Sequence, residues 1–150
     1  MEQPTAWSPR FQASLEASWK EGIAASVMIA MTDYYLIPLG LFLGATAPQI
    51  GLLVAIPHLL GSVTQIVAAE LLRLVGNRLR FLVRGALLQA STLVPVALLP
   101  LLNVPHRVAV LITCVALFRV SGNMVGAVWG SLVSSYLPPD RRGKYFGWRA

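Results

Sequence analysis

Four long apolar runs divide the chain, and short segments rich in proline, glycine or charge separate them. Each run holds the roughly 20 residues that a helix needs to cross a bilayer core of about 30 Å. None of the runs shows the polar face of a helix on the surface of a soluble protein. The pattern predicts an all-α, polytopic transmembrane bundle with helices at about residues 21–44, 48–73, 80–102 and 107–137.

The ends of the runs carry signals of their own. Residues 1–20 are polar, and we expect them to form a cytoplasmic tail. The segment from Ser18 to Glu21 has the spacing of a capping box, which predicts that the first helix starts nearby. Two prolines at 138–139 end the fourth run, because proline cannot continue the helical hydrogen bonds. Residues 143–150 predict the start of a fifth helix.

The composition excludes several classes of protein. Apolar residues make up 56% of the chain and charged residues 12%, against roughly 45–50% and about 25% in soluble domains. A short soluble protein must cover a large surface with polar groups, which argues against a cytosolic enzyme and a soluble nucleic-acid-binding domain. A disordered chain would need low hydrophobicity. The single cysteine, Cys114, excludes an intramolecular disulfide and a multi-thiolate metal site.

Lysine and arginine indicate the orientation of the bundle, because cytoplasmic loops carry an excess of both. With the N-terminus in the cytoplasm, only Arg107 lies outside, and Arg119 lies within a run. This bias predicts an integral protein of a bacterial inner membrane, with the lipid bilayer and not nucleic acid as its partner. The ten basic residues placed inside are Arg10, Lys20, Arg73, Arg78, Arg80, Arg84, Arg141, Arg142, Lys144 and Arg149.

Two charged residues lie near the middle of apolar runs, Asp33 in the first and Arg119 in the fourth. A charge at that depth costs roughly 2.5–3.5 kcal/mol on insertion scales, so each is expected to face a polar interior. Both lie at similar distances from their helix starts, which predicts a comparable depth. They either form an ion pair or are satisfied separately by backbone and water. Tyr34 follows Asp33 and is a candidate for the same cavity.

Other polar residues within the runs are candidates for a substrate path. His58 follows a proline in the second run, where it is either a structural residue or a proton relay. Gln65, Gln89 and Asn123 either hydrogen-bond between helices or contact a substrate. The substrate-path candidates are therefore Asp33, Tyr34, His58, Arg119 and Asn123.

Small residues recur four positions apart in two of the runs. Such rows let helix backbones approach closely, so they indicate packing and do not identify a substrate. The rows are Gly122, Gly126 and Gly130 in the fourth run, and Gly22, Ser26 and Ala30 in the first.

The sequence contains no recognisable catalytic constellation. A nucleophile elbow, a His-Glu-x-x-His zinc motif and a phosphate-binding loop are all missing from these 150 residues. An enzyme is therefore disfavoured, and the residues predict neither a cofactor nor a metal site.

Three motifs follow one another between the runs. They are the short turn at residues 43–53, the acid–Arg–Gly–basic pattern of Glu70, Arg73, Gly76, Arg78 and Arg80, and the Pro-x-x-x-Arg-Gly pattern of Pro138, Arg142 and Gly143. In this order they resemble the N-terminal part of a major facilitator superfamily transporter. The third motif is the most specific of the three. In the second, Arg73 stands where the family's signature has an acid, and Glu70 lies one turn earlier.

The resemblance implies a fold and a mechanism. Twelve helices would form two six-helix halves, each built of inverted three-helix repeats. Residues 21–150 would then be part of the N-terminal half, and the chain an N-terminal fragment. The two halves would move a small solute by alternating access, with loop residues Glu70, Arg73, Gly76, Arg78, Arg142 and Gly143 as candidates for the conformational change.

The resemblance also implies roles for the charged residues. The first and fourth helices of the family line the central cavity, which would place Asp33 and Arg119 in the path. Arg119 resembles the arginine of a fourth-helix signature in proton-coupled members, with Asn123 where that signature has glycine. Coupling to a proton or ion is therefore an expectation.

Two other classes remain open on the residues alone. The first is a small four- or five-helix membrane protein that acts as a subunit or scaffold, with the small-residue rows as its contacts. The second is a membrane enzyme whose active residues lie downstream.

Overall fold

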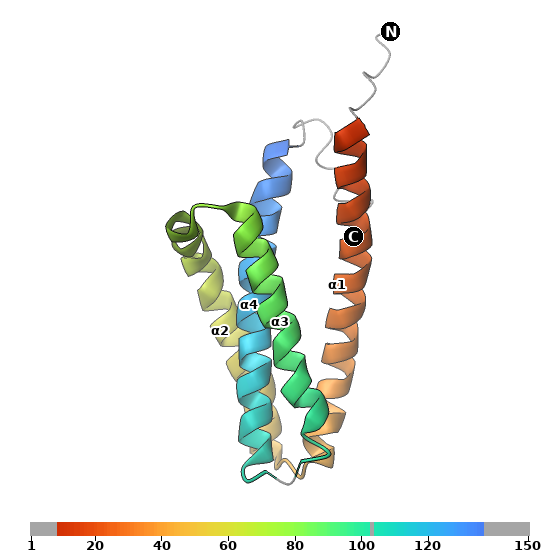
Figure 1. The fold of residues 1–150 in the computed structure, drawn as a ribbon. Coiled ribbons are helices and arrows are strands. Elements are labelled where there is room, and N and C mark those ends of the chain that lie inside the picture. Colours follow the sequence, from red (N-terminus) through yellow and green to blue (C-terminus); the bar gives the residue numbers. More distant parts are fainter. Residues whose placement is uncertain (1–8, 103, 137–150) are drawn as a thin grey trace.

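The computed structural model describes residues 9–102 and 104–136, which form four helices. All four are long and apolar enough to cross a membrane, and no strand occurs within the described ranges. The prediction of an all-α transmembrane bundle is therefore confirmed. Figure 1 shows the helices α1 (Pro9–Phe42), α2 (Ala47–Val75), α3 (Arg78–Leu98) and α4 (Arg107–Tyr136).

The first helix begins earlier than the sequence predicts. α1 starts at Pro9, so the capping-box segment that begins at Ser18 lies inside the helix, and the expected start there is wrong. Proline suits the first turn because its missing N–H would have no helical partner there. Two to three turns further along α1, Lys20 Nζ donates to Glu16 Oε1 at 2.7 Å, and such a pair one helical turn apart supports a helix. The part of α1 that is apolar enough to span a membrane begins at Glu16.

The other helix ends differ less from the predicted bounds. α3 stops at Leu98, four residues short of the predicted end, and a turn follows in which Leu101 and Leu102 both donate to the Leu98 carbonyl. The predicted start of a fifth helix at residues 143–150 lies outside the described residues, as do residues 1–8.

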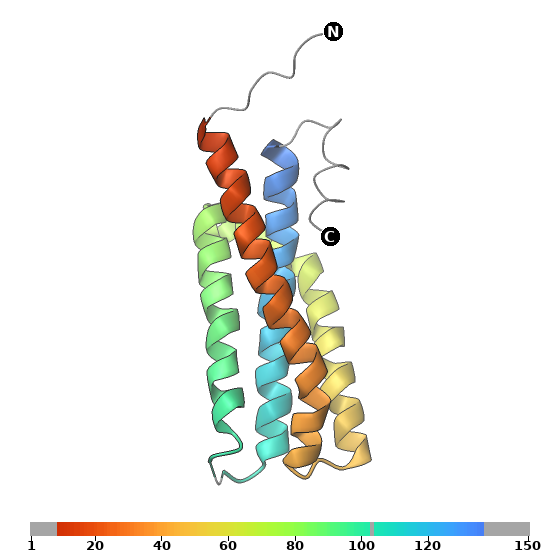
Figure 2. The same cartoon turned by 90° about the vertical axis from the view of Figure 1, so that its right-hand side faces the viewer.

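The central helix of the bundle is α4. Figure 2 shows it between α3 and α2, with α1 passing diagonally in front, and Figure 1 shows that α1 stands apart from it along most of its length. α2 and α3 each pack along α4, but they touch one another much less. The apolar core lies near the α1–α2 and α3–α4 connections, where Leu53, Leu99, Leu111 and Val115 form a buried cluster.

Glycines make room for this packing at specific points. The α2 backbone at Gly61 lies directly against the Asn123 amide of α4, and a Cβ at Gly122 would be 2.6 Å from Gln89 Nε2 of α3. By contrast, a Cβ at Gly126 or Gly130 would meet nothing within 4 Å. The predicted small-residue row of α4 is therefore a close packing contact at Gly122 and open space at the other two positions.

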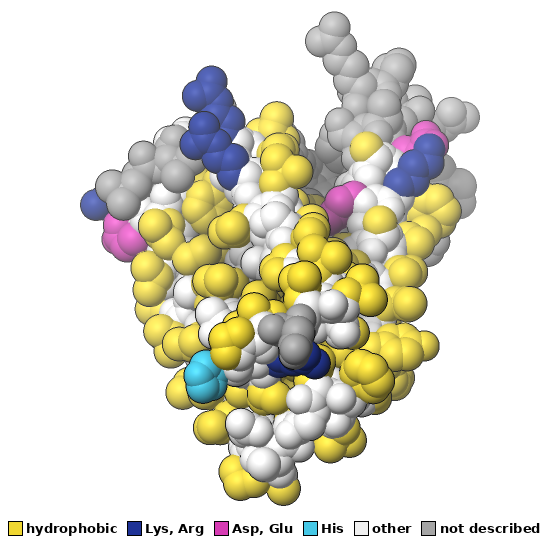
Figure 3. Space-filling view, turned by 60° about the horizontal axis from the view of Figure 1, so that its bottom comes forward, with side chains coloured by type: hydrophobic (Ala, Val, Ile, Leu, Met, Phe, Trp, Pro, Cys, Tyr) yellow, Lys and Arg dark blue, Asp and Glu magenta, His cyan; other side chains and the backbone are white. Residues whose placement is uncertain are grey.

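The outside of the bundle is apolar along its sides, as Figure 3 shows. Large hydrophobic side chains such as Phe42, Ile66 and Leu101 are 75–80% exposed. A soluble protein would cover such a surface, whereas hydrocarbon tails solvate it. The arrangement is that of an integral membrane protein.

Candidate functional site

A charged pair joins α1 to α4 in the middle of the bundle. Arg119 Nη2 donates a hydrogen bond to Asp33 Oδ1 and forms a salt bridge with it. The Arg119 side chain is 20% exposed and that of Asp33 is 44% exposed. Of the two alternatives that the sequence leaves open, the structure therefore shows the ion pair. Mutual neutralisation lowers the cost of placing either charge at membrane depth.

The pair lies between two cavities. A larger cavity of ≈ 500 Å³ lies between α1, α3 and α4, and Arg119 is part of its wall. A smaller cavity of ≈ 290 Å³ lies between α1, α2 and α4, and both Asp33 and Arg119 line it. Ligand pockets in proteins typically measure ~300–1,000 Å³, so the larger cavity has room for a small molecule.

The other substrate-path candidates divide between these cavities. His58 lines the smaller cavity with the ion pair, and Asn123 lines the larger one. Tyr34 lines neither cavity and is 80% exposed, so the structure does not bring it to the pair. Three of the five predicted residues, Asp33, His58 and Arg119, thus line the smaller cavity, and Asn123 lines the larger cavity together with Arg119.

The polar amides of the helices differ in their partners. Gln65 Nε2 donates to Asn123 Oδ1 at 3.3 Å and connects α2 to α4, so of the two alternatives for these residues the structure shows the interhelical hydrogen bond. Gln89 is only 7% exposed. Its amide lies over Gly122 and lines the larger cavity, and among the described residues no hydrogen-bond partner of this amide is found.

The loop between α2 and α3 is compact. Arg73 and Glu70 form an exposed salt bridge of 3.3 Å within α2, a type that contributes little to stability. Gly76 ends α2 in the left-handed conformation with φ 66°, and its N–H donates to the Leu72 carbonyl. Asn77 then caps α3 by accepting from the Arg80 N–H at 3.1 Å.

Of the three remaining loop candidates, Arg78, Arg142 and Gly143, the structure describes one. Arg78 is exposed at the start of α3. Arg142 and Gly143 lie outside the described residues.

Several residues that form the larger cavity carry no signal in the sequence. Met28, Phe118 and Trp129 line it, but an apolar residue in an apolar run is indistinguishable from one that faces lipid. Glu21 also lines the cavity, although its spacing from Ser18 favours a capping role. A polar residue within an apolar run is the one available signal, and it singles out Gln89, which lines the larger cavity.

A bundle of membrane-spanning helices with a charged pair between two of them and cavities on both sides of that pair is the arrangement of a polytopic membrane protein. The family model of the Major Facilitator Superfamily matches residues 16–150. The chain belongs to this family, as the sequence motifs indicated. Its members are membrane transporters rather than enzymes, which is compatible with the prediction from the residues. No curated protein and no solved structure matches the chain.

Proposed function

We propose that this chain belongs to the N-terminal half of a secondary transporter that moves a small solute across the membrane by alternating access. The observation that carries this proposal is the Asp33–Arg119 ion pair between two cavities. A solute that passes between the cavities has to pass the pair. A midplane polar site flanked by spaces is what an alternating-access mechanism requires.

The ion pair supplies a physical means of coupling. A proton that binds Asp33 removes its negative charge and weakens its attraction for Arg119. α1 and α4 can then separate at the smaller cavity, which His58 also lines. Because Arg119 forms part of both walls, its release changes both cavities together. In this proposal a proton is the coupling ion, and Asp33 is its binding site.

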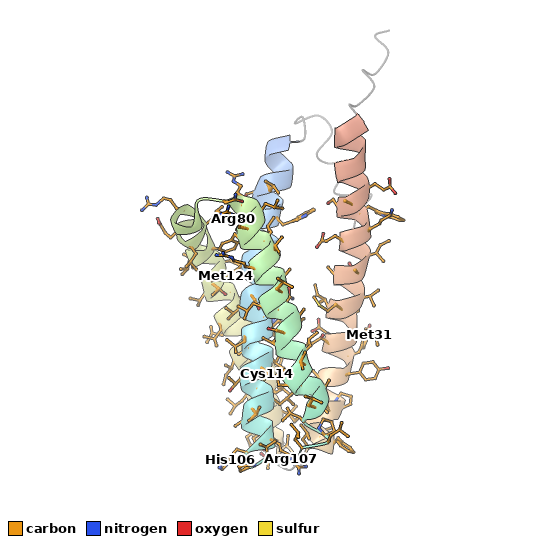
Figure 4. The ribbon with its side chains drawn as sticks, viewed as in Figure 1. Met31, Arg80, His106, Arg107, Cys114 and Met124 are labelled. Carbon is orange, nitrogen blue, oxygen red and sulfur yellow. The ribbon has the colours of Figure 1, made fainter. Side chains whose placement is uncertain are left out.

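The distribution of basic residues supports an orientation. Figure 4 shows Arg80 near the α2–α3 end of the bundle, whereas His106 and Arg107 lie at the opposite end. Arg73 and Arg78 flank the same α2–α3 connection. The positive-inside rule then assigns the α2–α3 end, and with it the N-terminus, to the cytoplasm of a bacterial cell.

Cysteine accessibility tests alternating access without knowledge of the solute. The native full-length protein, freed of Cys114 and other cysteines, would carry one cysteine at Ile37, which lines the smaller cavity. An impermeant methanethiosulfonate reagent would be added to either face of membrane vesicles. We expect modification from both faces, because the opening alternates. A matched control is Ile66→Cys, which is 80% exposed outside both cavities and should react little from either face.

Modification from one face alone, with and without a proton gradient, would contradict the proposal. A fixed cavity of that kind is what the subunit or scaffold class predicts.

A further inference from the structure

The side-chain amide of Gln89 is a buried polar group that has no hydrogen-bond partner among the described residues. The residue is 7% exposed, its head group borders the larger cavity, and the described residues supply no hydrogen-bond partner for it. A buried amide without a partner is unfavourable, and a bilayer offers little water to satisfy it. A Cβ at Gly122 would collide with this amide, so the glycine at this position of α4 leaves the space that the Gln89 side chain occupies.

The rest of the cavity is mainly apolar. Met28 and Ile29 of α1 face Phe118 and Trp129 of α4 across it. Beside Gly126 the wall is open, since a Cβ there would meet no atom within 4 Å. The cavity therefore combines a large apolar surface with one polar group on its α3 side.

The charged groups at the wall have both signs. Glu21 and Arg119 are the charged residues that line the cavity, and Asp33 holds Arg119, so the wall offers an anion no net positive charge. The desolvation of an anionic ligand would therefore go uncompensated. An uncharged ligand avoids this cost.

We propose that the larger cavity binds an uncharged amphipathic solute, whose amide, carbonyl or hydroxyl group pairs with the Gln89 side chain. Its apolar body lies against Phe118 and Trp129. This inference rests on the proposed transport function and names the substrate class of that site.

Photolabelling tests the inference with a matched pair of probes. 4-Benzoylbenzamide is neutral and carries an amide, whereas 4-benzoylbenzoate has the same rings and a negative charge. Each would be irradiated with the native full-length protein in lipid nanodiscs, and labelled methionines would be identified by mass spectrometry. Met28 lines the cavity, while Met31 lines none of the described cavities and is 54% exposed, which makes it a control for labelling from the lipid.

We expect saturable labelling of Met28 by the neutral probe, weaker labelling by the anion, and no saturation at Met31. Gln89→Leu should raise the half-saturating concentration about tenfold, because it removes a buried hydrogen bond. Gly126→Leu should abolish saturable labelling by filling the cavity. Gly51→Leu is its control, because Gly51 also has open space at its Cβ position but lines no described cavity.

Equal labelling by both probes, or an unchanged concentration dependence in Gln89→Leu and Gly126→Leu, would overturn the inference. So would an unlabelled Met28, the result expected if another segment of the protein fills the cavity. The photolabelling experiment measures binding and not transport. If Met28 is labelled saturably but the cysteine at Ile37 reacts from one face only, the binding inference stands and the proposed transport function is contradicted.

Discussion

Asp33 of α1 and Arg119 of α4 are 86 positions apart in the sequence, and the fold brings their side chains into one ion pair. The pair joins α1 to the central helix of the bundle at a point where the larger and smaller cavities meet the same arginine. A change at this contact therefore acts on both cavities.

Replacement of Asp33 by Asn should impair transport strongly. The substitution keeps the shape of the side chain but removes the charge that neutralises Arg119. We expect the initial rate of solute uptake into proteoliposomes to fall about tenfold or more, which corresponds to roughly 1.4 kcal/mol. Gln65→Ala serves as a control, because it removes only a 3.3 Å hydrogen bond in an exposed position. Equal and small effects of both variants would exclude Asp33 from the path.

Gly61→Val should destabilise the packing of α2 against α4. The α2 backbone at this position is in direct contact with the Asn123 amide, so a side chain would force the helices apart. Overpacking of this kind costs about 1–3 kcal/mol, and thermal unfolding in detergent would show a lower Tm. Gly51→Val lies on the same helix with open space around it. If the Tm of Gly51→Val fell as far as that of Gly61→Val, the loss of stability would come from helix propensity and not from the contact with Asn123.

Gly76→Ala should destabilise the α2–α3 loop. Gly76 has φ 66°, in the left-handed region that residues with a Cβ rarely adopt. The expected cost is roughly 1–2 kcal/mol, measured as a fall in Tm. Gly76→Asn is the matched comparison, because asparagine tolerates this conformation better than alanine does. If alanine and asparagine had the same effect, backbone strain would not explain the choice of glycine here.

The proposed orientation predicts opposite labelling of the two ends of the bundle. In intact cells, an impermeant maleimide should label a cysteine at His106 but reach one at Arg78 only after the membrane is permeabilised. His106 lies in the α3–α4 connection and Arg78 at the start of α3, and both are exposed. The reverse pattern would place the N-terminus outside the cytoplasm.

The sequence predicted the features that a bilayer imposes most strongly. Run length marked the four helices, because roughly 20 apolar residues are needed to cross the membrane. The cost of a buried charge marked Asp33 and Arg119, although sequence alone could not decide between a direct pair and separate partners. The contact depends on where α1 lies relative to α4, and α1 is positioned mainly by its packing against α2 at one end of the bundle.

The remaining differences have local causes. Helix propensity extends α1 to Pro9, three turns before the polar segment gives way to the apolar run. Tyr34 is adjacent to Asp33 in sequence, yet one residue is a rotation of about 100° on a helix, and this turns it to the exposed side. The lining of the larger cavity depends on which apolar residues face inward, a choice that an almost uniformly apolar run does not encode.

The central position of α4 has a consequence for how the protein is made. Ribosomes synthesise α1, α2 and α3 first, but α2 and α3 find most of their contacts along α4 and few with each other. The amides of Gln89 and Asn123 meet their glycine surfaces only when residues 107–136 have entered the bilayer. Until then α2 and α3 lack most of their packing surface, and the insertion of α4 is the step that joins them into one bundle.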